Sequence, residues 1–368
     1  MPQSYCDGTT YIAREADRSM TLYSPGNEGH VSAEFVRSNP RNCNPHLVIL
    51  GAGASIQAFP HGDADGRLLP SMENFVELVG MENTIRVSEV TKSETNFEVI
   101  YGRLHSNSLM REQLTEIEDK VRRYFCDMRL PAEPTLYDHL LLSLRGHDLI
   151  ATFNWDPLLF DSWERLSNQF GQNHLPTVAY LHGNVRVGYC LDHKVCGRNG
   201  RICPDCDKTL TPTPLLFPIE NKDYESDEFI KNEWQRLQAG LEHASAVTIF
   251  GYGAPASDRA AIDTMRAAWS GEGERQFETI FIIDVKPEIE IEDSWRPFFF
   301  GHHYRIEKDF YDSWLPRHAR RSIETLMVPT AEGRFVEDLP IPFGGTWSQL
   351  EDWFRDMARI EERFAKDK

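Results

Sequence analysis

The sequence predicts an α/β protein, a doubly wound parallel sheet with a helical insertion and a small cysteine-bearing module. Three observations lead to this prediction. Short apolar runs alternate along the chain with longer segments of helical period, which is the pattern of parallel strands joined by helices. Two of the apolar runs end in glycine-rich turns, at 51–55 and 251–258. Four of the seven cysteines fall between positions 190 and 206.

Five apolar runs are predicted to be buried strands. They are 46–50, 148–152, 177–181, 246–250 and 279–283. Each is short, rich in branched residues and bounded by polar or glycine residues, which favours a strand over a helix. In parallel α/β sheets ligands bind beyond the carboxyl ends of the strands. Polar residues that follow these runs are therefore the candidates for a site.

The segments around the strands divide the chain into three parts. Residues 1–45 are polar with no strong period and are predicted to be a lead-in, apart from a short helix around 31–36. Residues 46–310 are predicted to form the sheet-bearing domain, with a helical insertion at about 71–145 that packs over the carboxyl edge of the sheet. Residues 311–368 are predicted to be a helical extension.

Composition excludes several classes of function. The chain has 368 residues and a formal net charge of −18, so direct binding to the nucleic-acid backbone is not expected. No apolar run approaches the ~20 residues that a membrane-spanning helix needs. The first residues lack the charged and apolar regions of a signal peptide, and we expect a cytoplasmic protein.

The glycine turns are candidates for contacting a dinucleotide phosphate. Gly51, Ala52, Gly53 and Ser55 follow the first strand and begin a helix, whose amides and dipole favour an anion. A tight turn without a ligand is the alternative, because Ile56 stands where the dinucleotide fingerprint has its third glycine. The second turn supplies Gly251, Tyr252 and Asp258 as further candidates.

Four other polar residues follow predicted strands. Asp284 is placed to accept hydrogen bonds from ribose hydroxyls, or to act only as a turn residue. Asn154, Asp156 and His182 form the candidate catalytic set, although a strand-end histidine is often structural. An amide and a carboxylate suit the oxocarbenium-like charge that develops when the bond to nicotinamide breaks, and a histidine suits activation of the attacking oxygen.

The cysteines predict a structural zinc site. Cys203 and Cys206 form a CxxC half-site, and Cys190 and Cys196 are its predicted partners, with His193 as a substitute for one thiolate. Free cysteines in a polar loop are the alternative. A closed set of four ligands leaves no open position for catalysis, so zinc here would support the fold.

Taken in order, these motifs resemble those of the sirtuin superfamily. The similar segments are GAGAS at 51–55, TFNWD at 152–156, LHGN at 181–184, CPDC at 203–206 with Leu210 and Pro212, GYGAPASD at 251–258, and Ile283-Asp284. The resemblance implies NAD binding in a Rossmann-like domain beside a zinc module. It also implies catalytic roles for Asn154 and His182, with Asp156 near the nicotinamide pocket.

Two departures from that family indicate a different acceptor. A GIPDFR-type segment is replaced by residues 62–75, and the strand that grips acyl-lysine is replaced by 215–220. The chain looks more like the bacterial sirtuin-like NADases of anti-phage defence, some of which work with a DNA-translocase ATPase. The resemblance thus implies an NAD+ hydrolase controlled by homo-oligomerisation or by such a partner. A protein deacylase or ADP-ribosyltransferase and a non-catalytic nucleotide sensor are the alternatives.

Overall fold

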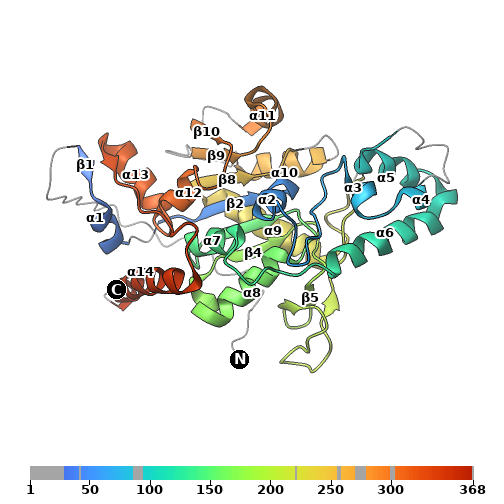
Figure 1. Cartoon of the computed structure of the whole chain (residues 1–368), viewed down its shortest axis with the longest axis horizontal. Coiled ribbons are helices and arrows are strands. Elements are labelled where there is room, and N and C mark those ends of the chain that lie inside the picture. Colours follow the sequence, from blue (N-terminus) through green and yellow to red (C-terminus); the bar gives the residue numbers. More distant parts are fainter. Residues whose placement is uncertain are drawn as a thin grey trace.

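A computed structural model describes residues 29–40, 43–85, 94–219, 222–254, 258–269, 279–298 and 303–366. Figure 1 shows a central sheet with a helical group at one end, a small hairpin module below it and the C-terminal helices at the other end. Among the described residues, no helix combines the length and apolar character needed to cross a membrane.

The central sheet has six parallel strands in the order β10-β9-β8-β2-β3-β4. They are β2 (His46–Leu50), β3 (Leu149–Thr152), β4 (Thr177–Tyr180), β8 (Ala246–Phe250), β9 (Thr279–Ile283) and β10 (His303–Glu307). The five predicted strands are confirmed. The edge strand β10 was not predicted, because its sequence His-Tyr-Arg-Ile-Glu is largely exposed and lacks an apolar run.

This strand order is the doubly wound order of dinucleotide-binding domains. Counted along the chain, the six strands lie in the order 3-2-1-4-5-6, with β2 as the first and β8 as the fourth. The order therefore reverses between β2 and β8. Leu50 is in register with both Thr152 and Phe250, so β3, β2 and β8 end at the same level. Ligands of such sheets bind at this reversal.

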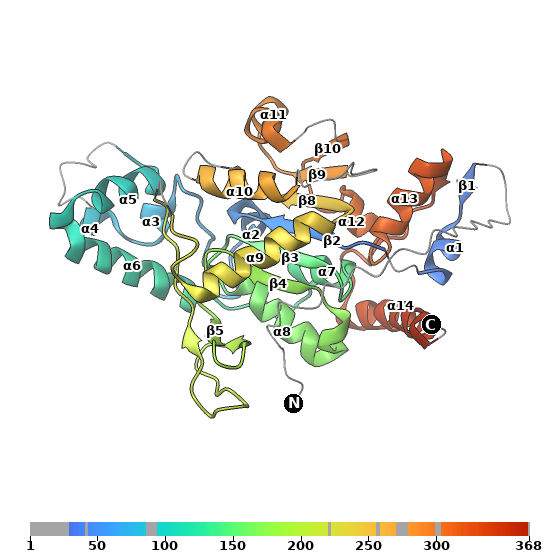
Figure 2. The ribbon, with the colours of Figure 1, turned by 180° about the vertical axis from the view of Figure 1, so that it is seen from behind.

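Both faces of the central part of the sheet are buried, which explains why strands β2, β3, β8 and β9 are largely apolar. Along β2, Val48 and Leu50 point into one core, while Leu47 and Ile49 point into the other. Helices α2 (Ala52–Ala58), α7 (Leu136–Ser143) and α8 (Leu158–Phe170) contribute to the first core, and α9 (Glu228–His243) and α10 (Arg259–Trp269) cover the second. Figure 2 shows α9 and α10 in front of the sheet, on the face opposite α2 and α7.

The predicted insertion contains a group of helices that extends beyond the sheet. It comprises α3 (Phe75–Leu78), α4 (Glu82–Ile85), α5 (Phe97–His105), η2 (Ser108–Met110) and α6 (Arg111–Cys126). The apolar period of α6 is confirmed, because Leu114, Ile117, Val121 and Phe125 are its buried residues. An aromatic cluster joins the group to the sheet: Phe75 stacks on Phe97 at 4.4 Å between ring centroids and meets Trp155 edge-on.

A small antiparallel sheet follows β4. It consists of β5 (Val187–Cys190), β6 (Val195–Arg198) and β7 (Thr211–Pro212), in the order β6-β5-β7. It projects from the body of the molecule in both views. This sheet holds the cysteine segment.

The described part of the predicted lead-in docks on the C-terminal extension. The short helix predicted near 31–36 is α1 (Ala33–Ser38), and the preceding β1 (His30–Val31) pairs in parallel with β11 (Phe335–Val336). Val31 and Val36 pack against Leu339 and Met357. Residues 1–28 lie outside the described part of the chain. The remaining elements are η3 (Gln172–His174), α11 (Glu288–Trp295), η5 (Arg296–Phe298), α12 (Trp314–Arg317), α13 (Ser322–Glu332) and α14 (Trp347–Lys366).

Candidate functional site

The two glycine turns meet at the reversal of strand order. Gly51 N donates to Phe250 O at 3.0 Å, and Gly53 N donates to Gly251 O at 2.9 Å. A Cβ on Gly51 would lie 2.5 Å from Gly251 O, and one on Gly251, whose φ is +61°, would fall on Ala54 N. The contact between the two turns thus accounts for these glycines by itself. Their predicted role at a phosphate, shared with the exposed Ala52, stays a prediction.

Ser55, in helix α2, is a buried hydrogen-bonding centre. Its Oγ donates to Asp156 Oδ2 at 2.7 Å, accepts from Asn154 Nδ2 at 2.9 Å and lies 2.6 Å from Tyr137 OH. Because its one proton goes to Asp156, the Tyr137 hydroxyl must donate to it. A serine hydroxyl has one donor and two lone pairs. The donor and both acceptor positions of the Ser55 hydroxyl, which was predicted to contact the cofactor, are thus occupied by other site residues.

Asn154 follows β3 and reaches across to the first glycine turn. Its Nδ2 donates to Gly51 O at 2.9 Å as well as to Ser55. Both amide protons are therefore engaged within the protein. The amide oxygen accepts no hydrogen bond from the described residues and is the group left to face a ligand.

Asp156 lies in the same loop, two residues before the start of α8. Its Oδ1 accepts from Leu158 N at 3.1 Å, in the manner of a helix cap, and its backbone oxygen accepts from Asn184 Nδ2 at 2.7 Å. Burial raises the pKa of Asp156 to about 6, although the hydrogen bonds from Ser55 and Leu158 N oppose this rise. The carboxylate is thus a buried group that titrates near neutral pH.

His182 follows strand β4, which lies next to β3 in the sheet. Its ring meets Phe153 edge-on at 4.8 Å and stacks on Tyr224 at 6.2 Å. No hydrogen bond joins it to Asn154 in the described structure, and its buried Nε2 has no partner there. Burial lowers the pKa of His182 to about 4; Asp258 opposes this effect and Lys222 adds to it. The imidazole is therefore neutral at pH 7.

The second turn is held by stacking and by an ion pair. The Tyr252 ring stacks on Phe153 at 4.1 Å, and its hydroxyl donates to Asp258 Oδ2 at 2.9 Å. Lys222 forms a buried ion pair with the same carboxylate. Lys222 was not predicted, since an isolated lysine in a polar loop carries no signal in the sequence. Residues 255–257 of the turn lie outside the described structure.

Asp284 is placed as a turn residue. Its Oδ1 accepts from Lys286 N at 2.9 Å, directly after β9. This is the second of the two roles expected for it. A ribose contact stays a prediction.

Tyr137 is the main site residue that sequence reasoning missed. It lies on α7, which begins with a capping box formed by Thr135 and Asp138, and it is fully buried. Burial raises the pKa of Tyr137 well above the ordinary value for tyrosine, and the negative charge of Asp156 raises it further. Its sequence context is that of an apolar helix face. Only the fold brings its hydroxyl to Ser55.

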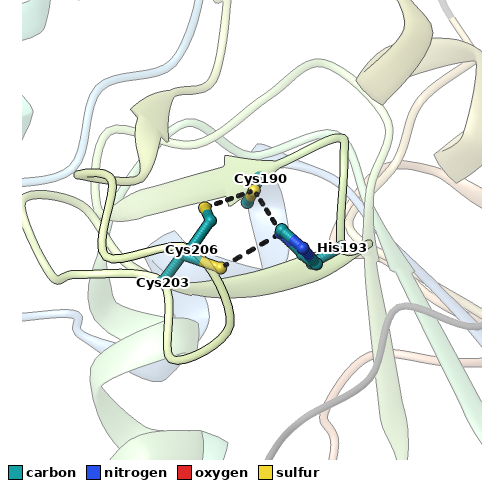
Figure 3. Close-up of side chains that lie close together, drawn as sticks. All are labelled: Cys190, His193, Cys203 and Cys206. Atoms are coloured by element: carbon teal, nitrogen blue, oxygen red, sulfur yellow. Dashed lines mark hydrogen bonds between the residues drawn. The ribbon is translucent and has the colours of Figure 1, made fainter.

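Four side chains of the small sheet form a candidate metal centre. Figure 3 shows Cys190, His193, Cys203 and Cys206 converging, and their ligand atoms lie within 4.8 Å of one another. Cys190 Sγ lies 3.6 Å from His193 Nδ1 and 3.8 Å from Cys206 Sγ, and Cys203 Sγ lies 3.8 Å from His193 Nδ1. A tetrahedral zinc with its usual bond lengths separates two sulfurs by ~3.8 Å, and a sulfur from a nitrogen by ~3.6 Å. The residues fit zinc.

The structure groups His193, and not Cys196, with the other three predicted ligands. Tyr189 pairs with Cys196 and Cys190 with Val195 across the hairpin, so Cys196 points to the face opposite Cys190. Cys196 packs with Tyr189 against the second core of the main sheet, whereas Cys190 packs with Cys203 and Cys206. His193, in the turn of the hairpin, takes the fourth position.

Comparison with known proteins gives only distant structural likeness. No protein-family model matches the chain, and no curated protein matches it. A Sir2 variant solved with a deacetylated p53 peptide and 3′-O-acetyl-ADP-ribose is similar with a TM-score of 0.34 and 14% identity, covering 81% of this chain and 96% of that one. A Sir2 homolog–NAD complex has a TM-score of 0.36 and 12% identity, covering 92% and 97%. These values are too low to assign a family or an activity, so the α/β assignment rests on the strand order.

Proposed function

We propose that this chain binds NAD+ at the β2–β8 reversal and hydrolyses the bond between its ribose and nicotinamide. The observation that carries the proposal is the position of Asn154, whose side chain is fixed to Gly51 O and Ser55 at the point where dinucleotide-binding sheets hold their ligand. The two glycine turns lie there together, and Asp284 follows the adjoining strand β9. All these groups lie beyond the carboxyl ends of the strands.

The chemistry assigns one role to each of three side chains. The oxygen of a water molecule bonds to C1′ of the nicotinamide ribose while the C1′–N bond breaks. The electron pair of the broken bond stays on the ring nitrogen and neutralises the pyridinium. His182 accepts the water proton at Nε2, which is buried and unpartnered among the described residues. Asn154 orients the ribose through its amide oxygen. Asp156 holds Ser55 and α8 in place and adds negative charge near the developing oxocarbenium ion.

Water is proposed as the acceptor because the segment after β7, the position at which a peptide-gripping strand was looked for in the sequence, does not form such a strand. Strand β7 ends at Pro212, and no strand follows in the described residues 213–219. Phe217 instead packs on Trp155 and Tyr101, with ring centroids 4.9 and 5.0 Å apart. The segment after β7 therefore lies against the helical insertion rather than offering an edge to a substrate strand.

The test combines binding and turnover on the purified chain. NAD+ alone should bind and give nicotinamide and ADP-ribose, measured by calorimetry and chromatography. Loss of a general base typically costs ~10²–10⁴-fold in rate. His182→Ala and Asn154→Ala should therefore be at least ~100-fold slower, while the exposed His303 on β10 supplies a matched control, His303→Ala.

Other results would point to the alternatives. Release of nicotinamide only when an acyl-lysine peptide is added indicates a deacylase. Binding without release under every condition indicates a nucleotide sensor. Unchanged hydrolysis in His182→Ala would refute its assignment as the base.

The metal centre and the biological setting complete the proposal. Cys190, His193, Cys203 and Cys206 would hold a structural zinc that ties the hairpin to the CPDC loop. Depletion of cellular NAD+ in anti-phage defence, under control of self-assembly or an ATPase partner, is proposed only from the resemblance of the motifs. Expression in bacteria with and without phage, comparing wild type with Asn154→Ala, tests that role.

A further inference from the structure

His182, the proposed base, lies between aromatic side chains from separate parts of the chain. Phe153 meets the imidazole edge-on, and Tyr224 lies nearly parallel to it, with an interplanar angle of 10° and ring centroids 6.2 Å apart. His182 and Phe153 are buried, at 6% and 8% exposed. Tyr224, in contrast, is half-buried. Of these two rings, Tyr224 is therefore the one that forms the outer wall beside the imidazole.

Helix α9 supports the Tyr224 ring from behind. The ring packs on Trp234, with ring centroids 4.2 Å apart. The indole Nε1 of Trp234 donates to Leu181 O at 3.1 Å, in the residue directly before His182. One tryptophan thus holds both the covering ring and the strand end that carries the base. The Tyr224 hydroxyl has no hydrogen-bond partner among the described residues, so the ring is the part that makes these contacts.

The segment that carries Tyr224, residues 222–227, is anchored at both ends. Lys222 forms a buried ion pair with Asp258 of the second glycine turn. Asp227 is the N-cap of α9, where its side chain accepts from the backbone of the first helical turn. The Tyr224 ring is therefore part of a fixed wall, and a ligand that reaches His182 has to fit against it.

We propose that Tyr224 is a specificity-determining residue, whose ring limits the acceptor at His182 to water. This inference rests on the proposed function, in which His182 accepts the proton of the attacking group. The acceptor has to bring its oxygen to C1′ of the ribose and to Nε2, which is fully buried. Water requires the least displacement of the wall, whereas an alcohol also has to place its carbon atoms beside the Tyr224 ring. Steric exclusion of the wrong partner is a common source of specificity.

The reaction with an alcohol is balanced in the same way as hydrolysis. The alcohol oxygen bonds to C1′ while the C1′–N bond breaks, nicotinamide leaves with the electron pair of that bond, and the alcohol proton goes to Nε2 of His182. The product is an O-glycoside of ADP-ribose in place of free ADP-ribose. The ratio of glycoside to ADP-ribose therefore measures how well an acceptor larger than water competes, independently of the overall rate.

The test uses the full chain, NAD+ and glycerol as the competing alcohol, with products separated by chromatography and identified by mass spectrometry. The wild type should give ADP-ribose with little glycoside. Tyr224→Ala should raise the ratio of glycoside to ADP-ribose at least ~tenfold, because pocket size commonly discriminates by ~10–200-fold. Tyr224→Leu keeps an apolar side chain against Trp234 and should also raise the ratio, so it serves the same test if the alanine variant does not fold.

Two further variants are the controls. Tyr224→Phe keeps the ring and should keep the ratio of the wild type. Tyr189 is another half-buried tyrosine of the same core, and its ring stacks on Phe229 at 4.9 Å and not on His182. Tyr189→Ala removes the same number of atoms and should leave the ratio unchanged.

The possible failures of this inference and of the proposed function differ. Hydrolysis with an unchanged ratio in Tyr224→Ala or its leucine substitute overturns the inference and leaves the proposed function standing. An equal rise in Tyr189→Ala would show general loosening of the core, and an equal rise in Tyr224→Phe would assign the effect to the hydroxyl; either result overturns the inference. No release of nicotinamide by the wild type refutes the proposed function, and the inference with it.

Discussion

Asn154 Nδ2 and Ser55 Oγ are joined by a hydrogen bond of 2.9 Å that ties the end of β3 to helix α2. Both residues are buried, and Ser55 also holds Tyr137 and Asp156. The orientation of the proposed catalytic amide therefore depends on a serine that has no hydrogen-bonding capacity left for a ligand. Four predictions follow from this network and from the other contacts of the fold.

Ser55→Ala should destabilise the protein and disorder the Asn154 amide. The change leaves the Tyr137 hydroxyl, one Asn154 proton and one Asp156 oxygen without their buried partner, which costs about 1–3 kcal/mol for each unsatisfied group. Tyr137→Phe is the milder variant, since it removes the hydroxyl itself and leaves one unfilled lone pair on Ser55. Urea unfolding measures both, and equal stability of Ser55→Ala and wild type would contradict the network.

Gly251→Ala should lower the free energy of unfolding by several kcal/mol, because a Cβ at this position falls on the backbone of the first turn. Gly200→Ala is the matched control. Gly200 also has a positive φ, +83°, but its Cβ would meet nothing within 4 Å. It should cost only the roughly 1 kcal/mol of a left-handed alanine. Similar losses in the two variants would show that backbone strain, and not contact between the turns, explains Gly251.

Stability should fall as the pH is lowered from about 6.5 to 4. Burial lowers the pKa values of His46, His182 and His318 from 6.5 to about 4, so over this range the unfolded chain binds protons that the folded chain does not. Each shift corresponds to roughly 3 kcal/mol. Asp156 acts in the opposite sense between pH 3.8 and about 6, because its pKa is raised on folding. The three histidines outweigh it.

Urea unfolding at a series of pH values checks this dependence. His318→Gln should flatten the slope between pH 6.5 and 4, because one of the histidines whose pKa burial lowers is removed. A free energy of unfolding that stays constant or rises as the pH falls over this range would contradict the prediction.

Zinc should bind in a ratio of about one per chain and depend on His193 but not on Cys196. His193→Ala and Cys203→Ser each remove a ligand from the cluster and should abolish stoichiometric zinc in protein prepared without chelator. Cys196→Ser should retain it, because that side chain lies on the opposite face of the hairpin. Metal analysis by mass spectrometry decides. Zinc lost from Cys196→Ser and kept in His193→Ala would restore the four-cysteine set.

Much of the architecture was predictable because it depends on local pattern. The runs from His46 and Ala246 are short and largely apolar, as expected of strands buried on both faces, and both are central strands of the sheet. The edge strand β10 was not predicted, because an edge strand with exposed residues such as Tyr304 needs no apolar run. The period of α6 identified its buried face for the same local reason.

The sequence by itself determined the order of strands and helices, the glycines of the turns and the residue types available for a site. Only the tertiary structure decided which of these residues meet. Phe153 and Asn154 are neighbours in sequence, yet one faces His182 and the other Gly51. Tyr137 contacts Ser55 although the two residues are 82 positions apart. Cys196 lies on the face of its hairpin strand that points away from Cys190, so that His193 joins the other three candidate zinc ligands. Side-chain chemistry is local, whereas hydrogen bonds and metal ligation require atoms within a few ångströms, and only the folded backbone sets those distances.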